Sequence, residues 1–152
     1  MIILRENLII RGILDIEIKT RHGTGWIVER QSYHNLITDA GRNTVKDLLL
    51  GSGFGPQAIA LGTSATAAAV DQVALGAEVF RGEMTRRLSE NKKCTFQLVL
   101  TEDDANGNTL NEAGLFNSTA DQTGTMLARA TYSPIVKNNT IQSTFTWTWE
   151  MP

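Results

Sequence analysis

Apolar and polar residues alternate along several short stretches of this chain, which is the pattern of half-buried β-strands. The clearest early case is Ile13 to Lys19, where every second residue is apolar and the residues that follow each of them are charged. After the glycine-containing turn at residues 22–25, residues 26–33 can return as an antiparallel partner. The pattern therefore predicts a β-hairpin near the beginning of the chain.

Further strands are predicted where short apolar runs are separated by turn-forming residues. They are residues 58–61, 94–101, 110–116, 126–132 and 141–151. In the last of these, Phe145, Trp147 and Trp149 alternate with threonines, which predicts one aromatic face in the core and one threonine-rich face outside. Residues 62–73 are predicted to be an exposed loop or one short helix, and residues 74–84 give weak signals of either kind.

One helix is predicted, from about Asp39 to Leu50. Thr38 or Asp39 can accept a hydrogen bond from the free amides of its first turn, and glycine at position 51 ends it. We expect Val45, Leu48 and Leu49 to form its buried stripe. Together these elements predict a mainly β protein: an antiparallel β-sandwich with this helix packed against it.

The chain has 152 residues, of which 41% are hydrophobic, and this is enough for one core. We therefore expect a single β-sandwich domain over residues 1–152, with residues 1–12 as an N-terminal arm or edge strand. A net charge of −2 gives no reason to expect a nucleic-acid partner. No segment reaches the ~20 apolar residues of a membrane helix, so we expect no membrane insertion. The apolar start shows no basic leader with a cleavage site, and the single cysteine excludes an internal disulfide, which favours synthesis in a reducing cytoplasm.

The loop Glu102–Asn108 is similar to a calcium-binding loop, because oxygen-bearing side chains alternate before a glycine. The spacing fails further on. Counting from Glu102, the position that should supply a bidentate carboxylate is Ala113, and Glu112 falls one residue early. We therefore predict a polar hairpin loop and no metal site.

No residue set predicts catalysis. His22 and His34 have no evident nucleophile with an acidic partner, and Cys94 lies on the apolar face of its strand. Within the segment Leu110–Asn117, Gly114 is expected to permit close packing and Glu112 to cap or pair locally. We predict no catalytic, cofactor-binding or metal-binding residues and no cofactor.

Three further features have both a functional and a structural interpretation. Trp147 and Trp149 can form a stacking platform, but their row is typical of a core. Trp26, beside a glycine turn, is the better candidate for an exposed ring, although packing within the hairpin is the favoured interpretation. A charged cluster is predicted to be a solvated face or a salt-bridged subunit contact; it comprises Arg81, Glu83, Arg86, Arg87, Glu90, Lys92 and Lys93.

Four segments in fixed order resemble a family of small structural proteins of tailed bacteriophages and prophages, described as tail, tail-fibre or baseplate-associated. They are residues 35–41 (NLITDAG), 59–64 (IALGTS), 110–116 (LNEAGLF) and 126–137 (MLARATYSPIVK). The resemblance extends from Asn35 to Met151 and includes the closing aromatic strand.

The resemblance implies a non-enzymatic virion subunit, made in the host cytoplasm, that assembles with copies of itself and with other tail or baseplate proteins, or links them to a fibre. The segment before Asn35 has the alternation expected of an arm that docks onto another subunit's sheet edge. Alternatives are a capsid decoration or neck protein, or a carbohydrate-binding module that recognises a host surface glycan through Trp26 and Phe54. Copy number, symmetry, receptor and position in the particle stay open, as does whether residues 1–12 and 62–77 order only on assembly.

Overall fold

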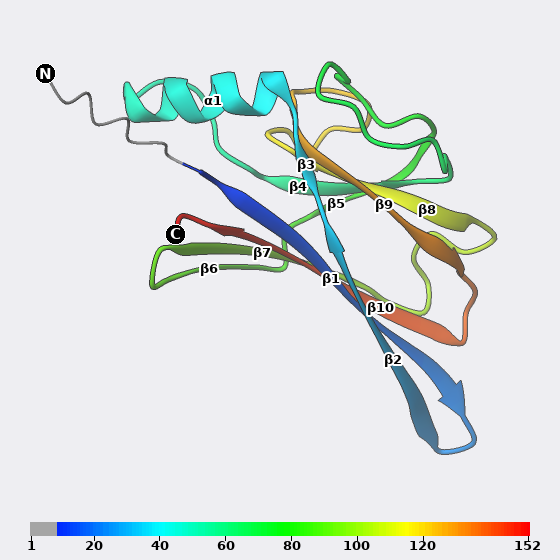
Figure 1. Ribbon diagram of the computed structural model, residues 1–152. Coiled ribbons are helices and arrows are strands. Elements are labelled where there is room, and N and C mark those ends of the chain that lie inside the picture. Colours follow the sequence, from blue (N-terminus) through cyan, green and yellow to red (C-terminus); the bar gives the residue numbers. More distant parts are fainter. Residues whose placement is uncertain (1–8) are drawn as a thin grey trace, which may run out of the picture.

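A computed structural model describes residues 9–152 and shows two antiparallel sheets of five strands each, with a single helix among these residues (Figure 1). The predicted β-sandwich class is confirmed. The elements in chain order are β1 (Arg11–His22), β2 (Gly25–His34), β3 (Leu36–Ile37), α1 (Asp39–Leu49), β4 (Ala58–Gly62), β5 (Glu78–Glu83), β6 (Arg86–Glu90), β7 (Lys93–Leu100), β8 (Thr109–Phe116), β9 (Met126–Val136) and β10 (Ile141–Glu150).

The first sheet has the strand order β2-β1-β10-β7-β6, and the second has the order β3-β9-β8-β4-β5. The predicted hairpin is present: β1 and β2 pair antiparallel across a two-residue turn, with His22 opposite Gly25. β2 ends at His34 and β3 begins at Leu36, so the chain passes from the first sheet to the second at Asn35. As a result, β2 is an outer strand of its sheet.

The core lies between the two sheets and is built from the alternating rows seen in the sequence. Leu14 of β1 lies opposite Trp147 of β10, and Trp147 in turn lies opposite Phe96 of β7, so these side chains share the inner face. Leu14, Phe145 and Trp147 are fully buried, and each such side chain contributes about 1.5–3 kcal/mol by leaving water. The predicted aromatic core is therefore confirmed.

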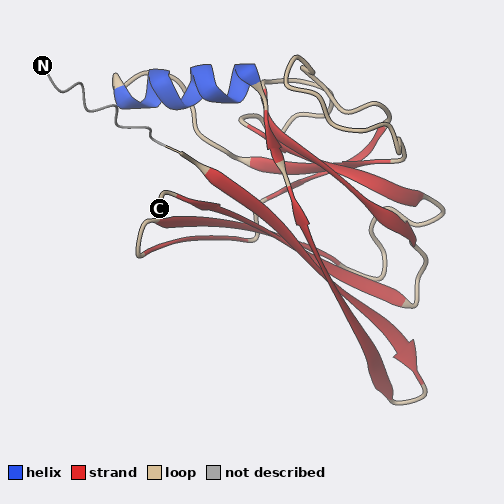
Figure 2. Ribbon diagram, in the orientation of Figure 1, coloured by secondary structure: helices blue, strands red, loops and turns tan. Residues whose placement is uncertain are grey.

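The helix begins and ends close to the predicted positions, but its buried face is different. Thr38 caps it, because its hydroxyl oxygen accepts a hydrogen bond from the Gly41 amide at 2.9 Å. Gly41 and Thr44 are its buried residues, whereas Leu48 and Leu49 are 41% and 77% exposed, so the predicted stripe is wrong at those two leucines. The helix lies across one end of the sandwich and contacts β9 (Figure 2), and its second half extends past the strands that could cover it.

The region with weak signals contains both a loop and a strand. Residues 63–77 form the loop, and β5 follows and pairs with β4 at the second sheet's edge. Most of the predicted N-terminal arm lies outside the described residues. Arg11 and Gly12 are an exception, because they begin β1, an interior strand, and pair with β10. These two residues belong to β1, and the arm assignment for the residues before them stays a prediction.

Candidate functional site

Glu112 of β8 and Arg129 of β9 form a buried ion pair. Both side chains are inaccessible to solvent, and the Arg129 guanidinium meets the Glu112 carboxylate at 2.8 and 2.9 Å. The same carboxylate accepts hydrogen bonds from the backbone amides of Ser64, Gly76 and Ala77 at 3.2, 2.9 and 2.8 Å. These five residues are called the Glu112 network below.

The Glu112 network fixes the loop between β4 and β5 to the second sheet. Its amides come from both ends of residues 63–77, and Arg129 also donates to Gln72 in the middle of this loop at 3.2 Å. The second sheet therefore holds both ends of this loop and Gln72 between them. Glu112 does pair, as predicted, but its partners lie on another strand and a distant loop, so the predicted local pairing is wrong.

Tyr132 extends this buried polar group without adding reactive chemistry. Its hydroxyl donates to the Glu112 backbone oxygen at 3.0 Å. Burial, together with the nearby Glu112 and Tyr33 groups, raises the pKa of Tyr132 well above its ordinary value. The hydroxyl is thus a fixed donor in a packed interior.

The acidic loop between β7 and β8 holds an ammonium group from this chain. Lys137 is buried, and its Nζ donates to Asn106 Oδ1 at 2.9 Å and to the Asn138 oxygen at 3.0 Å. Burial lowers the pKa of Lys137, while the charges of Asp104, Asp103 and Glu102 act in the opposite direction. The segment is a polar loop that closes around Lys137.

The histidines and the cysteine are not brought together. His22 lies beside the hairpin turn, His34 lies at the other end of the same hairpin, and Cys94 is half-buried opposite Trp149. Within residues 9–152, no three His, Cys, Asp or Glu side chains gather closely enough to hold a metal ion.

The predicted charged cluster divides into two parts. Arg81 is buried, pairs with Glu78 at 2.7 Å and lies over the Phe116 ring at 3.9 Å, so its assignment to a solvated face is wrong. It is buried because β5 turns its side chain toward the loop that follows β8, where it donates to the Ser118 and Thr123 oxygens. The remaining members are exposed: Glu83 at the end of β5, and the others on β6, on β7 or in the turn between them.

The aromatic residues also divide. Trp147 and Trp149 lie in the core, whereas Trp26 is 38% exposed and lies under the Arg21 guanidinium at 4.8 Å. Phe54 is 70% exposed, but it lies in the loop after α1, at the other end of the molecule from the hairpin turn (Figure 1). Trp26 and Phe54 therefore do not form one platform, and that part of the carbohydrate-binding hypothesis is wrong.

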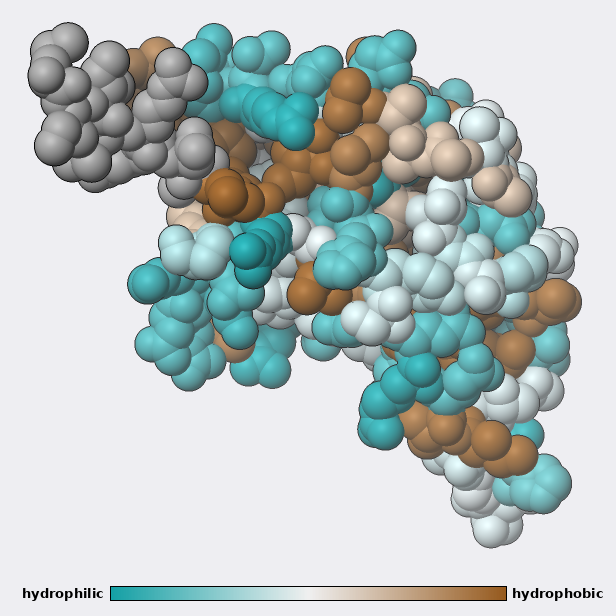
Figure 3. Space-filling model, viewed as in Figure 1, coloured by the Kyte–Doolittle hydropathy of each residue, from teal (hydrophilic) through white to brown (hydrophobic). Residues whose placement is uncertain are grey.

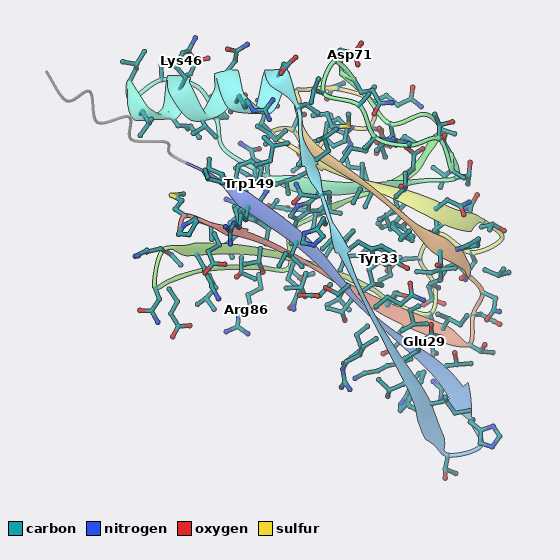
Figure 4. The ribbon with its side chains drawn as sticks, in the orientation of Figure 1. Glu29, Tyr33, Lys46, Asp71, Arg86 and Trp149 are labelled. Atoms are coloured by element: carbon teal, nitrogen blue, oxygen red, sulfur yellow. The ribbon has the colours of Figure 1, made fainter. Side chains whose placement is uncertain are left out.

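One continuous exposed segment is the hairpin end, defined as residues 21–30. Every residue in it is exposed, including Trp26, Ile27 at 57% and Val28 at 43%. The hairpin extends past the second sheet (Figure 1), and hydrophobic atoms lie among hydrophilic ones on its surface (Figure 3). Tyr33 points into the body of the protein, while Glu29 lies further out along the same strand (Figure 4).

The outer edge of β2 is open. In an antiparallel pair, alternate residues bond to the partner strand and those between them direct their N–H and C=O groups away from it. The Asn35 amide bonds to the Gly12 oxygen at 3.1 Å, which places the odd-numbered residues of β2 on the β1 side. The open edge therefore consists of the backbone groups of Trp26, Val28, Arg30 and Ser32, and no described strand covers it.

Comparisons with protein-family models, with curated proteins and with solved structures found no match to this chain. None of the helices in the described residues could cross a membrane. The candidate site therefore depends on geometry alone, and the open edge of β2 is the candidate interface.

The opposite edge of the same sheet differs in a way that supports this assignment. β6 is only five residues long, is fully exposed and carries charges at Arg86, Arg87 and Glu90. A short, charged edge is a common protection against pairing with another chain. β2 is ten residues long and carries three consecutive apolar residues at its far end. The sequence could have indicated this surface through Trp26, Ile27 and Val28, because consecutive apolar residues place apolar groups on both faces of a strand.

Charges on the outer face fix the middle of the hairpin. The Arg30 guanidinium lies 2.9 Å from the Glu17 carboxylate, and the Lys19 ammonium lies 3.4 Å from it. Desolvation alone would raise the pKa of Glu17, but hydrogen bonds from Arg30 and Lys19 and the charges of both outweigh it and hold the pKa below its usual value. Arg30 is itself 75% exposed, so it remains accessible to a partner.

Proposed function

We propose that this chain is a non-enzymatic structural subunit of a tailed-phage virion, where it assembles with copies of itself and with other tail or baseplate proteins, or links them to a fibre. The observation that carries the proposal is the open edge of β2 with its exposed apolar end. It is supported by the four segments that resemble phage structural proteins. The buried charges of Glu112, Arg129 and Arg81 are engaged in contacts that stabilise the fold, so the proposal gives them no other role.

The physical argument concerns exposure. Consecutive apolar side chains beside an unpaired strand edge are an aggregation hazard for a protein that stays alone. Natural edge strands are usually short, charged or covered, as β6 is here. A long edge that ends in Trp26, Ile27 and Val28 is instead the expected design of a surface that is covered in an assembly.

The test is to locate the chain in purified virions from the genome that encodes it. Quantitative mass spectrometry of the particles, followed by electron microscopy with and without the gene, should show a stoichiometric component and a matching missing density at the tail or baseplate. Density at the capsid surface or the neck would favour those alternatives. A protein made during infection but absent from purified particles would overturn the proposal.

The exposed ring of Trp26 keeps the glycan-binding alternative testable. A stacking ring contributes strongly to sugar binding, so Trp26→Ala should abolish any glycan-array signal in a chain that stays folded. Phe54→Ala is the control, because Phe54 is also an exposed aromatic residue but lies in the loop after α1, away from the hairpin turn. Binding that is lost only with Trp26 would favour this alternative.

A further inference from the structure

We propose that two copies of this chain pair through their β2 strands, antiparallel around a twofold axis at Val28, so that two five-stranded sheets become one continuous sheet. This inference deepens the self-assembly part of the proposed function and rests on it. The surface is the open edge, whose backbone groups at Trp26, Val28, Arg30 and Ser32 have no described strand beside them.

A second copy is the occupant that the edge itself favours. Antiparallel pairing of identical edges satisfies the outward N–H and C=O groups of both chains at once, and a twofold contact closes after two copies. The pairing cannot continue past the end of β2, because the chain leaves this sheet at Asn35 and enters β3 of the second sheet at Leu36. The second sheet thus approaches β2 at its His34 end, and the hairpin end is the accessible part.

Charge and backbone geometry select the register. Outward-facing groups must meet outward-facing groups, so each allowed register places one residue on the axis. An axis at Glu29 would oppose two carboxylates, and an axis at Arg30 would oppose two guanidinium groups, both of which are destabilising. An axis at Gln31 would place Val28 opposite His34, where the second sheet approaches the edge.

Two registers remain, with the axis at Ile27 or at Val28. An axis at Ile27 pairs only residues 25–29 of the two strands, because it runs into the turn. An axis at Val28 pairs residues 25–31 and therefore forms more backbone hydrogen bonds. It also places Arg30 of each copy opposite Trp26 of the other, on the same face, where a guanidinium can lie over the free side of an indole ring.

Sedimentation of the full-length chain over a concentration series tests the pairing. The wild type should show a monomer–dimer equilibrium. Val28→Pro removes an outward N–H and leaves the hydrogen bonds to β1 intact, so it should weaken dimerisation by roughly tenfold or more. Val28→Thr, which keeps the N–H and the β-branched shape, is the matched control and should dimerise. Circular dichroism checks that both variants are folded.

Cysteine cross-linking tests the register in a Cys94→Ser background. Val28→Cys places two thiols across the axis at the spacing of a disulfide, so mild oxidation should give a covalent dimer. Ser32→Cys lies on the same strand and the same face, but the register pairs Ser32 with residue 24 of the other copy, so its thiols should stay apart.

A wild type that remains monomeric, a Val28→Pro variant that dimerises like Val28→Thr, or cross-linking at Ser32→Cys equal to that at Val28→Cys would each overturn the inference. None of these results would alter where the chain is found in virions. Failure of the pairing and failure of the proposed function are therefore distinguishable.

Discussion

The Glu112 network and the hairpin end are opposite solutions to the placement of polar groups. In the network, two buried charges are paired, and three amides of the loop complete the set around the carboxylate. At the hairpin end, backbone groups along one edge point away from the fold, next to exposed apolar side chains. The first region makes its polar contacts within one chain, whereas the second leaves its outward backbone groups to solvent or to a partner strand.

This difference separates stability from assembly. Removal of a buried carboxylate leaves its charged and hydrogen-bonding partners unpaired in an apolar interior. An exposed strand edge can be changed with little effect on the folded chain, because water already satisfies it. Substitutions in the two regions should therefore affect different measurements.

The largest effect is expected in the Glu112 network. Glu112→Ala leaves Arg129 charged and buried and removes the acceptor of three loop amides, so it should lower the free energy of unfolding by about 3–5 kcal/mol. Glu17→Ala is the control at a surface ion pair whose arginine is 75% exposed, with an expected loss below about 1 kcal/mol. Urea unfolding followed by tryptophan fluorescence measures both. Equal losses would show that the Glu112 network does not stabilise the fold as argued.

The next largest effect is expected at the docked half of α1. A Cβ atom added to Gly41 would lie 2.0 Å from the Leu127 oxygen, so Gly41→Ala must displace the helix from β9, at a cost of about 1–3 kcal/mol. Leu49→Gln, in the exposed half, should change the free energy of unfolding by less than about 0.5 kcal/mol. The same urea titration checks this pair, and a larger loss at Leu49 would restore the stripe predicted from the sequence.

A smaller effect, with a distinct pH dependence, is expected at Lys137. Lys137→Met leaves the Asn106 and Asn138 oxygens without their donor and should cost about 1–2 kcal/mol at neutral pH. Because the folded-state pKa of Lys137 is lowered, the unfolded chain binds this proton more readily above that pKa. The stability of the wild type relative to Lys137→Met should therefore rise with pH, from the lowered pKa up to the ordinary lysine pKa of about 10.4. Unfolding titrations of both proteins from pH 7 to pH 10 measure this rise.

Exposed apolar residues of the hairpin end should matter least for folding. Ile27→Thr keeps a β-branched side chain and should change the free energy of unfolding by less than about 0.5 kcal/mol, because Ile27 is already 57% exposed. Thermal unfolding at low protein concentration, where the chain is monomeric, is the suitable measurement. A clear loss of stability there would mean that the hairpin end belongs to the core of the single chain.

The sequence predicted the parts of this fold in which a local pattern and the tertiary environment agree. Trp147 and Trp149 alternate with threonines, and a row of that kind has only one favourable side once a sandwich forms. The helix ends were predictable for a similar reason, because Thr38 acts on amides within its own turn.

The predictions that were wrong share one cause. Burial at those positions depends on neighbours from other parts of the chain, which the local sequence does not show. Nothing near Leu49 in the sequence shows that α1 extends past the second sheet. Arg81 is buried because its partners come from Glu78 and from a loop that follows β8. The open edge of β2 could be identified only from the strand order, since the alternation of apolar and polar residues cannot show which strand of a hairpin is outermost.

The last comparison concerns the half-buried carboxylate of Glu17, the cross-strand partner of Arg30 in the hairpin end. The pKa of Glu17 lies below its usual value because the effects of Arg30 and Lys19 outweigh desolvation. The sign follows from linkage: this group stabilises the fold above the ordinary glutamate pKa of about 4.3, and the contribution is lost as pH falls through the lowered folded-state value. In an NMR titration of the monomer, Arg30→Gln should move the Glu17 pKa upward, whereas Arg42→Gln, at an unrelated exposed pair, should leave it unchanged. An unmoved Glu17 in Arg30→Gln would mean that Arg30 is not held by Glu17 and reaches the open edge freely.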